Sequence, residues 1–193
     1  MMERGLFWVV VRTRVRFYRR PAMGERVTLT TWPEKPTRVS VTRNYRIERD
    51  GEVLAEGKSE WTLVELGSGR LHSTAGLFSE DFSFREETVW TEPFTRRRDE
   101  PGEEFARYTV RSTDIDLGGH TNNAAYVRIL AGAFSCGEWQ RMGPRELELA
   151  YRVSCFEGDT LCLQKRPDGD ALAFRMALPD GTLVVQGRVV PKE

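Results

Sequence analysis

Cysteine and histidine are scarce in this chain of 193 residues, which has three cysteines and two histidines. The odd number of cysteines at irregular spacing argues against a disulfide framework. No group of Cys and His has metal-site spacing, so we expect neither a metal nor another cofactor. An excess of one charge is also lacking, because 29 basic residues balance 29 acidic ones. The net charge therefore gives no reason to expect a nucleic acid or a membrane as partner.

Long apolar runs are missing as well. No segment approaches the roughly 18 apolar residues of a membrane-spanning helix. The first residues, MMERGLFWVVVRTR, contain a short apolar patch without a small-residue cleavage site and are not predicted to be a signal peptide. We therefore expect a soluble protein of the reducing cytoplasm, large enough for one medium-sized domain or two small ones.

Apolar and polar residues alternate in two sets of segments, which predicts strands with one buried and one solvated face. The alternation is clearest in the first strand, where Arg12, Arg14 and Arg16 share the face expected to be solvated. A mostly apolar run predicts one helix at residues 122–136. The expected strands are residues 7–18, 26–32, 38–49 and 53–65 in the first half, and 105–112, 146–153, 160–166, 171–177 and 183–190 in the second.

The two halves repeat a pattern at an offset of about 130 residues. Residues 15–29 and 149–163 each place a Gly-Glu or Gly-Asp turn between two strand-like runs. Residues 50–57 and 180–187 each begin with Asp-Gly, a strong hairpin signal. Internal duplication therefore predicts two sister units, residues 1–70 and 105–193, joined by a linker at 71–104.

Only the second copy contains a predicted helix, so we expect the first copy to lack its helix, which would lie upstream of Met1. A helix wrapped by a bent antiparallel sheet is the hot-dog architecture. The expected fold class is thus α+β, a tandem double hot-dog with antiparallel bent sheets around a central helix. Such units usually pair side by side, which predicts a monomeric pseudo-dimer or a homodimer.

The stretch DIDLGGHTNNAAY, residues 114–126, leads directly into the predicted helix. Glycines let a ligand approach the backbone, and the free N–H groups of a helix start can polarise a carbonyl oxygen. A carboxylate and an imidazole beside such a backbone suit attack on an acyl group. A capped loop with a structural histidine is the alternative interpretation. The candidate residues are Asp116, Gly118, Gly119, His120, Asn122 and Asn123.

Four segments in order along the chain carry a resemblance to one enzyme family. They are LFWVVVRTRVRFYRRPAMGERVTLTTW, GEVLAEGKSEWTLVE, DIDLGGHTNNAAYV and ELELAYRVSCFEGDTL. Together they resemble the plant and bacterial acyl-acyl-carrier-protein thioesterases, which are double hot-dog enzymes. The resemblance implies hydrolysis of fatty acyl thioesters held on the phosphopantetheine arm of acyl carrier protein, which terminates fatty acid synthesis.

The same resemblance implies roles for individual residues. Asp116 and His120 match the active-site Asp and His of the family, and Cys155 matches a cysteine proposed as its nucleophile. Gly118 stands where the family has Asn, and Ser154 stands where plant members have Glu. These two departures leave either a simpler Asp/His site or a weakly active protein.

The chemistry of these residue types supports the same roles. An imidazole such as that of His120 can act as general base at neutral pH, while Asp116 orients it or holds the water. A backbone N–H within residues 118–121 would bind the oxyanion. Cys155 is alternatively a buried strand cysteine, because a thiol attacks only as the thiolate. The aromatic candidates for an acyl pocket are Phe7, Trp8, Trp32, Trp61, Phe134 and Trp139.

Three other interpretations stay open. The protein is alternatively an acyl-CoA thioesterase, an enoyl-thioester hydratase, or a non-catalytic or weakly active protein that binds acyl groups or carrier protein. The arginines at 12, 14 and 16 form either a solvated face or a docking surface for an acidic carrier protein.

Overall fold

The structure, a computed structural model, describes residues 5–65, 67–79 and 81–192. The chain divides into two compact units, Met1–Phe94 and Thr95–Glu193. This division lies inside the predicted linker, and the repeat boundaries 1–70 and 105–193 stay a prediction. In the described part of the chain, no helix has the length and apolar character needed to span a membrane.

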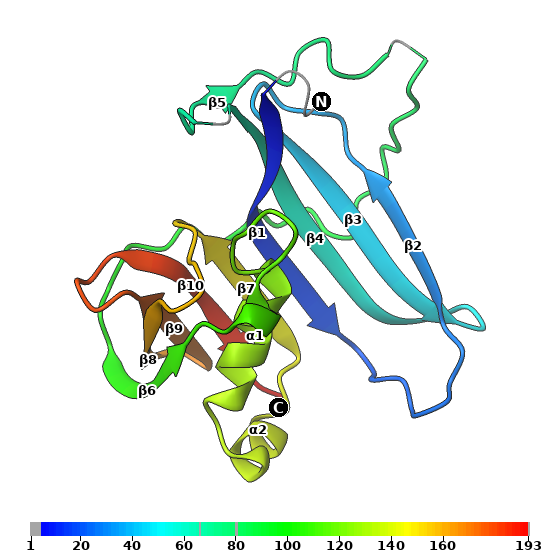
Figure 1. Ribbon diagram of the computed structural model, residues 1–193. Helices are drawn as coiled ribbons and strands as arrows, with labels where there is room; N and C mark the ends of the chain where they lie inside the picture. The colour runs from blue at the N-terminus through cyan, green and yellow to red at the C-terminus, as the bar shows by residue number, and fades with distance from the viewer. Residues whose placement is uncertain (1–4, 66, 80, 193) are drawn as a thin grey trace. The chain divides into compact units, whose positions relative to one another are not determined.

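The first unit is built on an antiparallel sheet (Figure 1). Its strands lie in the order β2-β3-β4-β1, with β5 paired to β4. Asp50 and Gly51 form the predicted turn between β3 and β4, and both have the positive φ that a two-residue hairpin turn requires. The described residues of this unit contain no α-helix. The strands are β1 (Leu6–Phe17), β2 (Thr28–Pro33), β3 (Ser40–Arg49), β4 (Glu52–Glu65) and β5 (Leu71–His72).

The second unit combines an antiparallel sheet, in the order β7-β10-β9-β8-β6, with two helices. The order β8-β9-β10-β7 repeats the order β2-β3-β4-β1 of the first unit, as internal duplication predicts. Its elements are β6 (Glu103–Thr109), a 3₁₀ turn (Ser112–Asp114), α1 (Asn123–Gly132), α2 (Cys136–Met142), β7 (Glu146–Tyr151), β8 (Thr160–Asp168), β9 (Ala171–Ala177) and β10 (Leu183–Val190).

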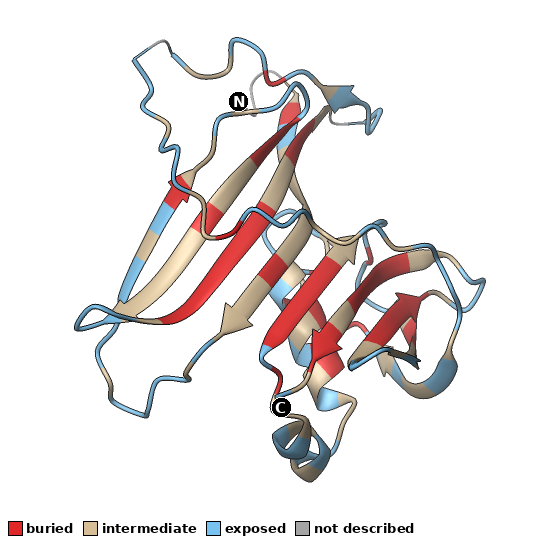
Figure 2. Cartoon of the chain, turned by 180° about the vertical axis from the view of Figure 1, so that it is seen from behind, coloured by how far each residue is buried: buried red, intermediate tan, exposed pale blue. Residues whose placement is uncertain are grey.

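Helix α1 packs its apolar side against this sheet. Ala125, Tyr126, Ile129 and Leu130 lie in one buried cluster with side chains of β7 to β10. Buried residues follow one another along β9 and β10 (Figure 2). A helix held on an antiparallel sheet is the arrangement predicted for this half of the chain.

The predicted single helix at residues 122–136 is wrong after Gly132. α1 ends at Gly132, and α2 begins at Cys136. The cause is a capping box, in which the Ser135 hydroxyl accepts from the Glu138 N–H and the Glu138 carboxylate accepts from the Ser135 N–H. Such a box starts a new helix even where the apolar pattern continues.

The prediction of a solvated arginine face on β1 is also wrong. Arg14 is only 4% exposed and donates to the Pro93 carbonyl at 2.8 Å, while the guanidinium of Arg16 lies 4.7 Å from the centre of the Trp90 ring. Trp90 and Pro93 thus cover Arg16 and Arg14, while Arg12 pairs with Glu60 at 3.5 Å. These arginines contribute to the packing of the first unit and do not form an open docking surface.

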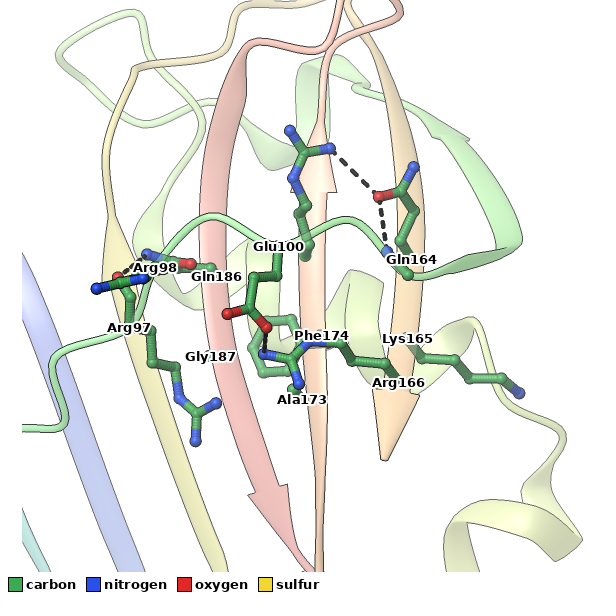
Figure 3. A pocket seen from close by; sticks show the side chains of 12 residues that line it. Arg97, Arg98, Glu100, Gln164, Lys165, Arg166, Ala173, Phe174, Gln186 and Gly187 are labelled. Carbon is green, nitrogen blue, oxygen red and sulfur yellow. Dashed lines mark hydrogen bonds and ion pairs between the residues drawn. The ribbon is translucent and has the colours of Figure 1, made fainter. Parts of the chain in front are cut away.

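Residues 95–102 are fastened across the sheet of the second unit by ion pairs. Asp99 pairs with Arg175 at 2.5 Å, and Glu100 pairs with Arg166 at 2.6 Å, as Figure 3 shows for Glu100. The cavity beneath holds only about 10 Å³, which is room for roughly one water molecule. This polar cluster therefore holds the chain in place and leaves no space for an organic ligand.

Candidate active site

Residues 115–121 form a small hairpin that brings Asp116 and His120 together. Ile115 and Thr121 make an antiparallel bridge, and the Asp116 N–H donates to the His120 carbonyl at 2.9 Å. Residues directly opposite each other in such a ladder point to the same side, with Cβ atoms ~4.5–5.5 Å apart. The hairpin therefore places the predicted carboxylate and imidazole next to each other.

Two adjacent glycines have different roles in this hairpin. Gly119 donates its N–H to the Asp116 carbonyl at 3.0 Å and has a φ of +77°, the left-handed conformation that a three-residue hairpin loop requires. Gly118 does not lie in that region. Its N–H donates to Asp116 Oδ1 at 2.8 Å, closing the local turn typical of aspartate. Asp116 is thus held by the backbone, with Oδ2 left for another partner.

The hairpin leads into the start of α1. Asn122 is the N-cap, and its Oδ1 accepts from the Ala124 N–H at 2.8 Å. The Asn122 N–H donates to the Asp114 carbonyl at 2.8 Å, which ties the helix start to the hairpin. Asn123 is the first helical residue, and the N–H of that position has no partner within the helix.

Hydrogen bonds within the backbone reduce the number of N–H groups that are available to bind an oxyanion. The predicted range was 118–121, but the N–H groups of Gly118 and Gly119 donate to Asp116, and that of Thr121 donates to the Cys155 carbonyl. Among the described residues, the His120 N–H has no acceptor. Within the predicted range, His120 is therefore the backbone donor left, and Asn123 offers a further one at the helix start.

Asp114 is a supporting residue that the sequence did not reveal. It is 1% exposed, and its carboxylate accepts from the Tyr108 hydroxyl at 2.8 Å, from the Arg111 N–H at 2.9 Å and from Arg128 at 2.5 Å. Burial acts to raise the pKa of Asp114, but these donors outweigh it and hold the pKa below its ordinary range. The carboxylate thus fastens the chain two residues ahead of Asp116. The sequence pattern that could have predicted this role is Arg-Ser-Thr-Asp at 111–114, which has the spacing of a capping box.

Cys155 lies beside the hairpin but is poorly suited to attack. It is fully buried, and burial together with the nearby Asp159 raises the pKa of its thiol to about 11. The thiol is therefore protonated at neutral pH and a weak nucleophile. The contact that links Cys155 to the site is its carbonyl, which accepts from the N–H and the hydroxyl of Thr121 at 2.8 and 3.0 Å.

We expect Cys155→Ala to keep kcat for thioester hydrolysis within about threefold of the wild type, because a protonated thiol is a poor nucleophile. Exposed Cys136 offers an internal reference for thiol reactivity. Iodoacetamide at neutral pH should alkylate Cys136 and spare Cys155, as read by mass spectrometry. A 100-fold loss of kcat in Cys155→Ala would instead support the role implied by the family resemblance.

An apolar pocket of about 270 Å³ lies in the first unit. Of the predicted acyl-pocket aromatics, Trp8 and Trp61 line it, together with Phe78 and Phe82. Trp32 does not, because it is buried and donates its indole N–H to a backbone carbonyl. Phe134 and Trp139 pack at the edge of the core of the second unit, and Phe7 is exposed. Among the described residues, no three His, Cys, Asp or Glu side chains gather as metal ligands.

Comparison with known proteins identifies the family. A family model described as the acyl-ACP thioesterase N-terminal domain matches residues 1–80, and one described as the C-terminal domain matches residues 98–179. An acyl-[acyl-carrier-protein] hydrolase of Cuphea viscosissima is 25% identical over 203 residues, covering 97% of this chain and 49% of that protein. An oleoyl-acyl carrier protein thioesterase of Coriandrum sativum is 22% identical over 183 residues, covering 88% and 50%.

A solved acyl-ACP thioesterase from Bacteroides thetaiotaomicron superimposes with a TM-score of 0.88 at 22% identity, covering 99% of this chain and 79% of that one. This likeness confirms the predicted double hot-dog fold. The chain spans about half the length of the curated relatives that it matches. The two family models together span most of the chain, which therefore belongs to the acyl-ACP thioesterase family.

Proposed function

We propose that the protein hydrolyses fatty acyl thioesters of acyl carrier protein, releasing the fatty acid and the carrier thiol. The observation that supports this proposal is the hydrogen bond from the Asp116 N–H to the His120 carbonyl, which pairs the two residues across the hairpin ahead of α1, so that their side chains extend to the same side. Membership in the family supplies the substrate class. In the cell, the reaction would end chain elongation in fatty acid synthesis, in the cytoplasm.

The proposed reaction begins with a water molecule held by Asp116 Oδ2 or by His120. The neutral imidazole of His120 takes a proton from this water as its oxygen attacks the thioester carbonyl. The backbone N–H groups of His120 and Asn123 stabilise the developing oxyanion, an effect worth ~3–4 kcal/mol in other enzymes. When the C–S bond breaks, the thiolate leaves and takes the proton from the imidazolium, which restores the enzyme.

A second candidate function is binding of acyl groups without hydrolysis. The apolar pocket of about 270 Å³ in the first unit is suited to an alkyl chain whether or not hydrolysis occurs. Gly118 and Ser154 favour low hydrolytic activity, because they offer no side-chain amide or carboxylate where the family pattern has Asn and Glu. Asp116 and His120 favour hydrolysis, and they carry the main proposal.

Release of free thiol from purified acyl carrier protein tests this proposal. Dodecanoyl and hexadecanoyl carrier proteins should be hydrolysed well above the uncatalysed rate, with a higher kcat/KM than the matching CoA thioesters. Equal kcat/KM for CoA and carrier thioesters would favour the acyl-CoA thioesterase. No hydrolysis, combined with saturable binding of both carrier proteins, would establish the binding function. Size-exclusion chromatography with light scattering would distinguish the proposed monomeric pseudo-dimer from a homodimer.

A further inference from the structure

One aromatic side chain contacts the imidazole of the candidate site. The rings of Phe156 and His120 lie 5.2 Å apart between centres, at an angle of 48°. This is within the range of favourable aromatic pairs. Among the described residues, the imidazole of His120 makes no side-chain hydrogen bond, and Asp116 Oδ1 is engaged with the Gly118 N–H. The phenyl ring is therefore the group that restricts how the imidazole turns.

The backbone of Phe156 is held in place by hydrogen bonds. Its N–H donates to Asp159 Oδ2 at 2.9 Å, and its carbonyl accepts from the Asp159 N–H at 3.1 Å. The turn is closed by Gly158, with a φ of +88°. Gly158 and Asp159 exchange hydrogen bonds with the backbone of Val110 at 2.9 Å each. A turn with these bonds presents the Phe156 side chain in one place.

The same turn is fastened to the hairpin from the other side. Thr121, the residue after His120, donates both its N–H and its hydroxyl to the carbonyl of Cys155, the residue before Phe156. The backbones that carry the two rings are thus joined next to the rings themselves. Any displacement of one ring relative to the other has to break this contact or change a side-chain rotamer.

Core packing alone does not account for Phe156. The residue is 52% exposed, although a phenylalanine in a core is almost fully buried. Its ring meets an imidazole that is itself partly exposed, at the surface where a substrate would arrive. The site therefore has an aromatic ring on a well-held backbone, half open to solvent and in contact with the proposed base.

We propose that Phe156 is a positioning residue that holds the His120 imidazole in the orientation that activates water. This inference rests on the proposed function and adds a residue outside the Asp/His pair. Without the ring, the imidazole is free to populate other rotamers, and the productive fraction falls. Loss of an aromatic pair of this kind should reduce the population of the productive imidazole rotamer by a factor of about 2–10. We expect kcat to fall by a similar factor.

The test compares Phe156→Ala, Phe156→Leu and Phe156→Tyr. We expect Phe156→Ala and Phe156→Leu to lower kcat about 3- to 10-fold with KM within about twofold, because orientation is lost while binding is kept. Phe156→Tyr keeps the ring and should restore kcat. The matched control is Val153→Ala, which trims another half-exposed apolar side chain of the same connection and should leave kcat unchanged. Thermal unfolding establishes that each variant is folded.

Nuclear magnetic resonance of the imidazoles shows whether the two rings are in contact in solution, and the loss of kcat at constant KM shows whether the contact positions the base. The chain has two histidines, so the signals of His120 can be followed with His72 as internal reference. In Phe156→Ala, loss of the ring current should shift the His120 signals and leave those of His72 in place, and Phe156→Tyr should reverse the shift.

Two results would overturn the inference while leaving the proposed function intact. One is an active wild type whose His120 signals are unchanged in Phe156→Ala. The other is a shift of these signals with kcat equal to that of the wild type. Failure of the proposed function looks different, since wild type and His120→Ala would then release thiol at the same background rate, and a positioning role in catalysis would fall with it.

Discussion

Replacing His120 with alanine should lower kcat for acyl carrier protein thioesters by roughly 10²–10⁴-fold, the usual contribution of a general base. Asp116 Oδ2 and the backbone donors stay in place in this variant, so a small residual rate above background is expected. Substrate binding depends on the acyl and carrier groups, and KM should change little. Initial rates of free-thiol release measure both constants.

His72→Ala is the matched control, because it removes the other histidine of the chain. His72 lies on β5 in the first unit, and its Nδ1 contacts the adjacent Ser73 carbonyl at 2.8 Å. We expect this variant to keep the wild-type kcat. If His120→Ala releases thiol as fast as the wild type, the imidazole has no part in hydrolysis, and the binding function becomes the better account.

The second large effect is expected at Asp114. Replacement with alanine leaves the Tyr108 hydroxyl and the Arg111 N–H without their acceptor and Arg128 without its ion-pair partner. Arg111 and Arg128 are exposed and Tyr108 is partly exposed, so water can replace the lost acceptor for them. Loss of the hydrogen bonds to the charged carboxylate should still lower the free energy of unfolding of the second unit by about 1.5–3 kcal/mol. Because the Asp114 carboxylate fastens the chain two residues ahead of Asp116, its loss should loosen the hairpin, and kcat should fall by about 10-fold. Urea unfolding and initial rates test the two effects.

The pH dependence of stability follows from the same contacts. The pKa of Asp114 is lower in the folded protein than in the unfolded chain, where it is about 4. Its stabilisation is therefore complete above about pH 4 and is lost as the pH falls through the folded pKa. Asp114→Asn, which keeps the shape without the charge, should show a smaller loss on acidification. A variant that matches the wild type in stability at neutral pH would contradict the role given to Asp114.

Strand positions were predictable because they rest on local patterns. Alternation and the Asp-Gly and Gly-Asp turns placed the strands to within a few residues of their observed bounds, and the strand order shared by the two units agrees with the predicted internal duplication. The buried Arg14 was not predictable from alternation alone. Its burial depends on Pro93 and Phe94, which are distant in sequence, and on a register shift between Val10 and Arg12 that changes the alternation.

The candidate site was predictable in part. Asp116, His120 and the N-cap Asn122 could be proposed from one short motif, because hairpin and helix-start chemistry is local. The burial of Cys155 and the ring contact of Phe156 arise from a segment 34 residues further along the chain than Thr121, held there by the bond between Thr121 and Cys155. The spacing of residues along the sequence does not predict a contact between segments that are so far apart.

The central claim is that a fatty acyl thioester is bound and hydrolysed at the hairpin of residues 115–121. The most direct test follows the His120 and His72 imidazole signals while dodecanoyl carrier protein is added, with an amide replacing the thioester so that no hydrolysis occurs. The account predicts a saturable shift of His120 with His72 unmoved. Saturable binding, seen through other resonances, with His120 unmoved would place the acyl group elsewhere and contradict the account.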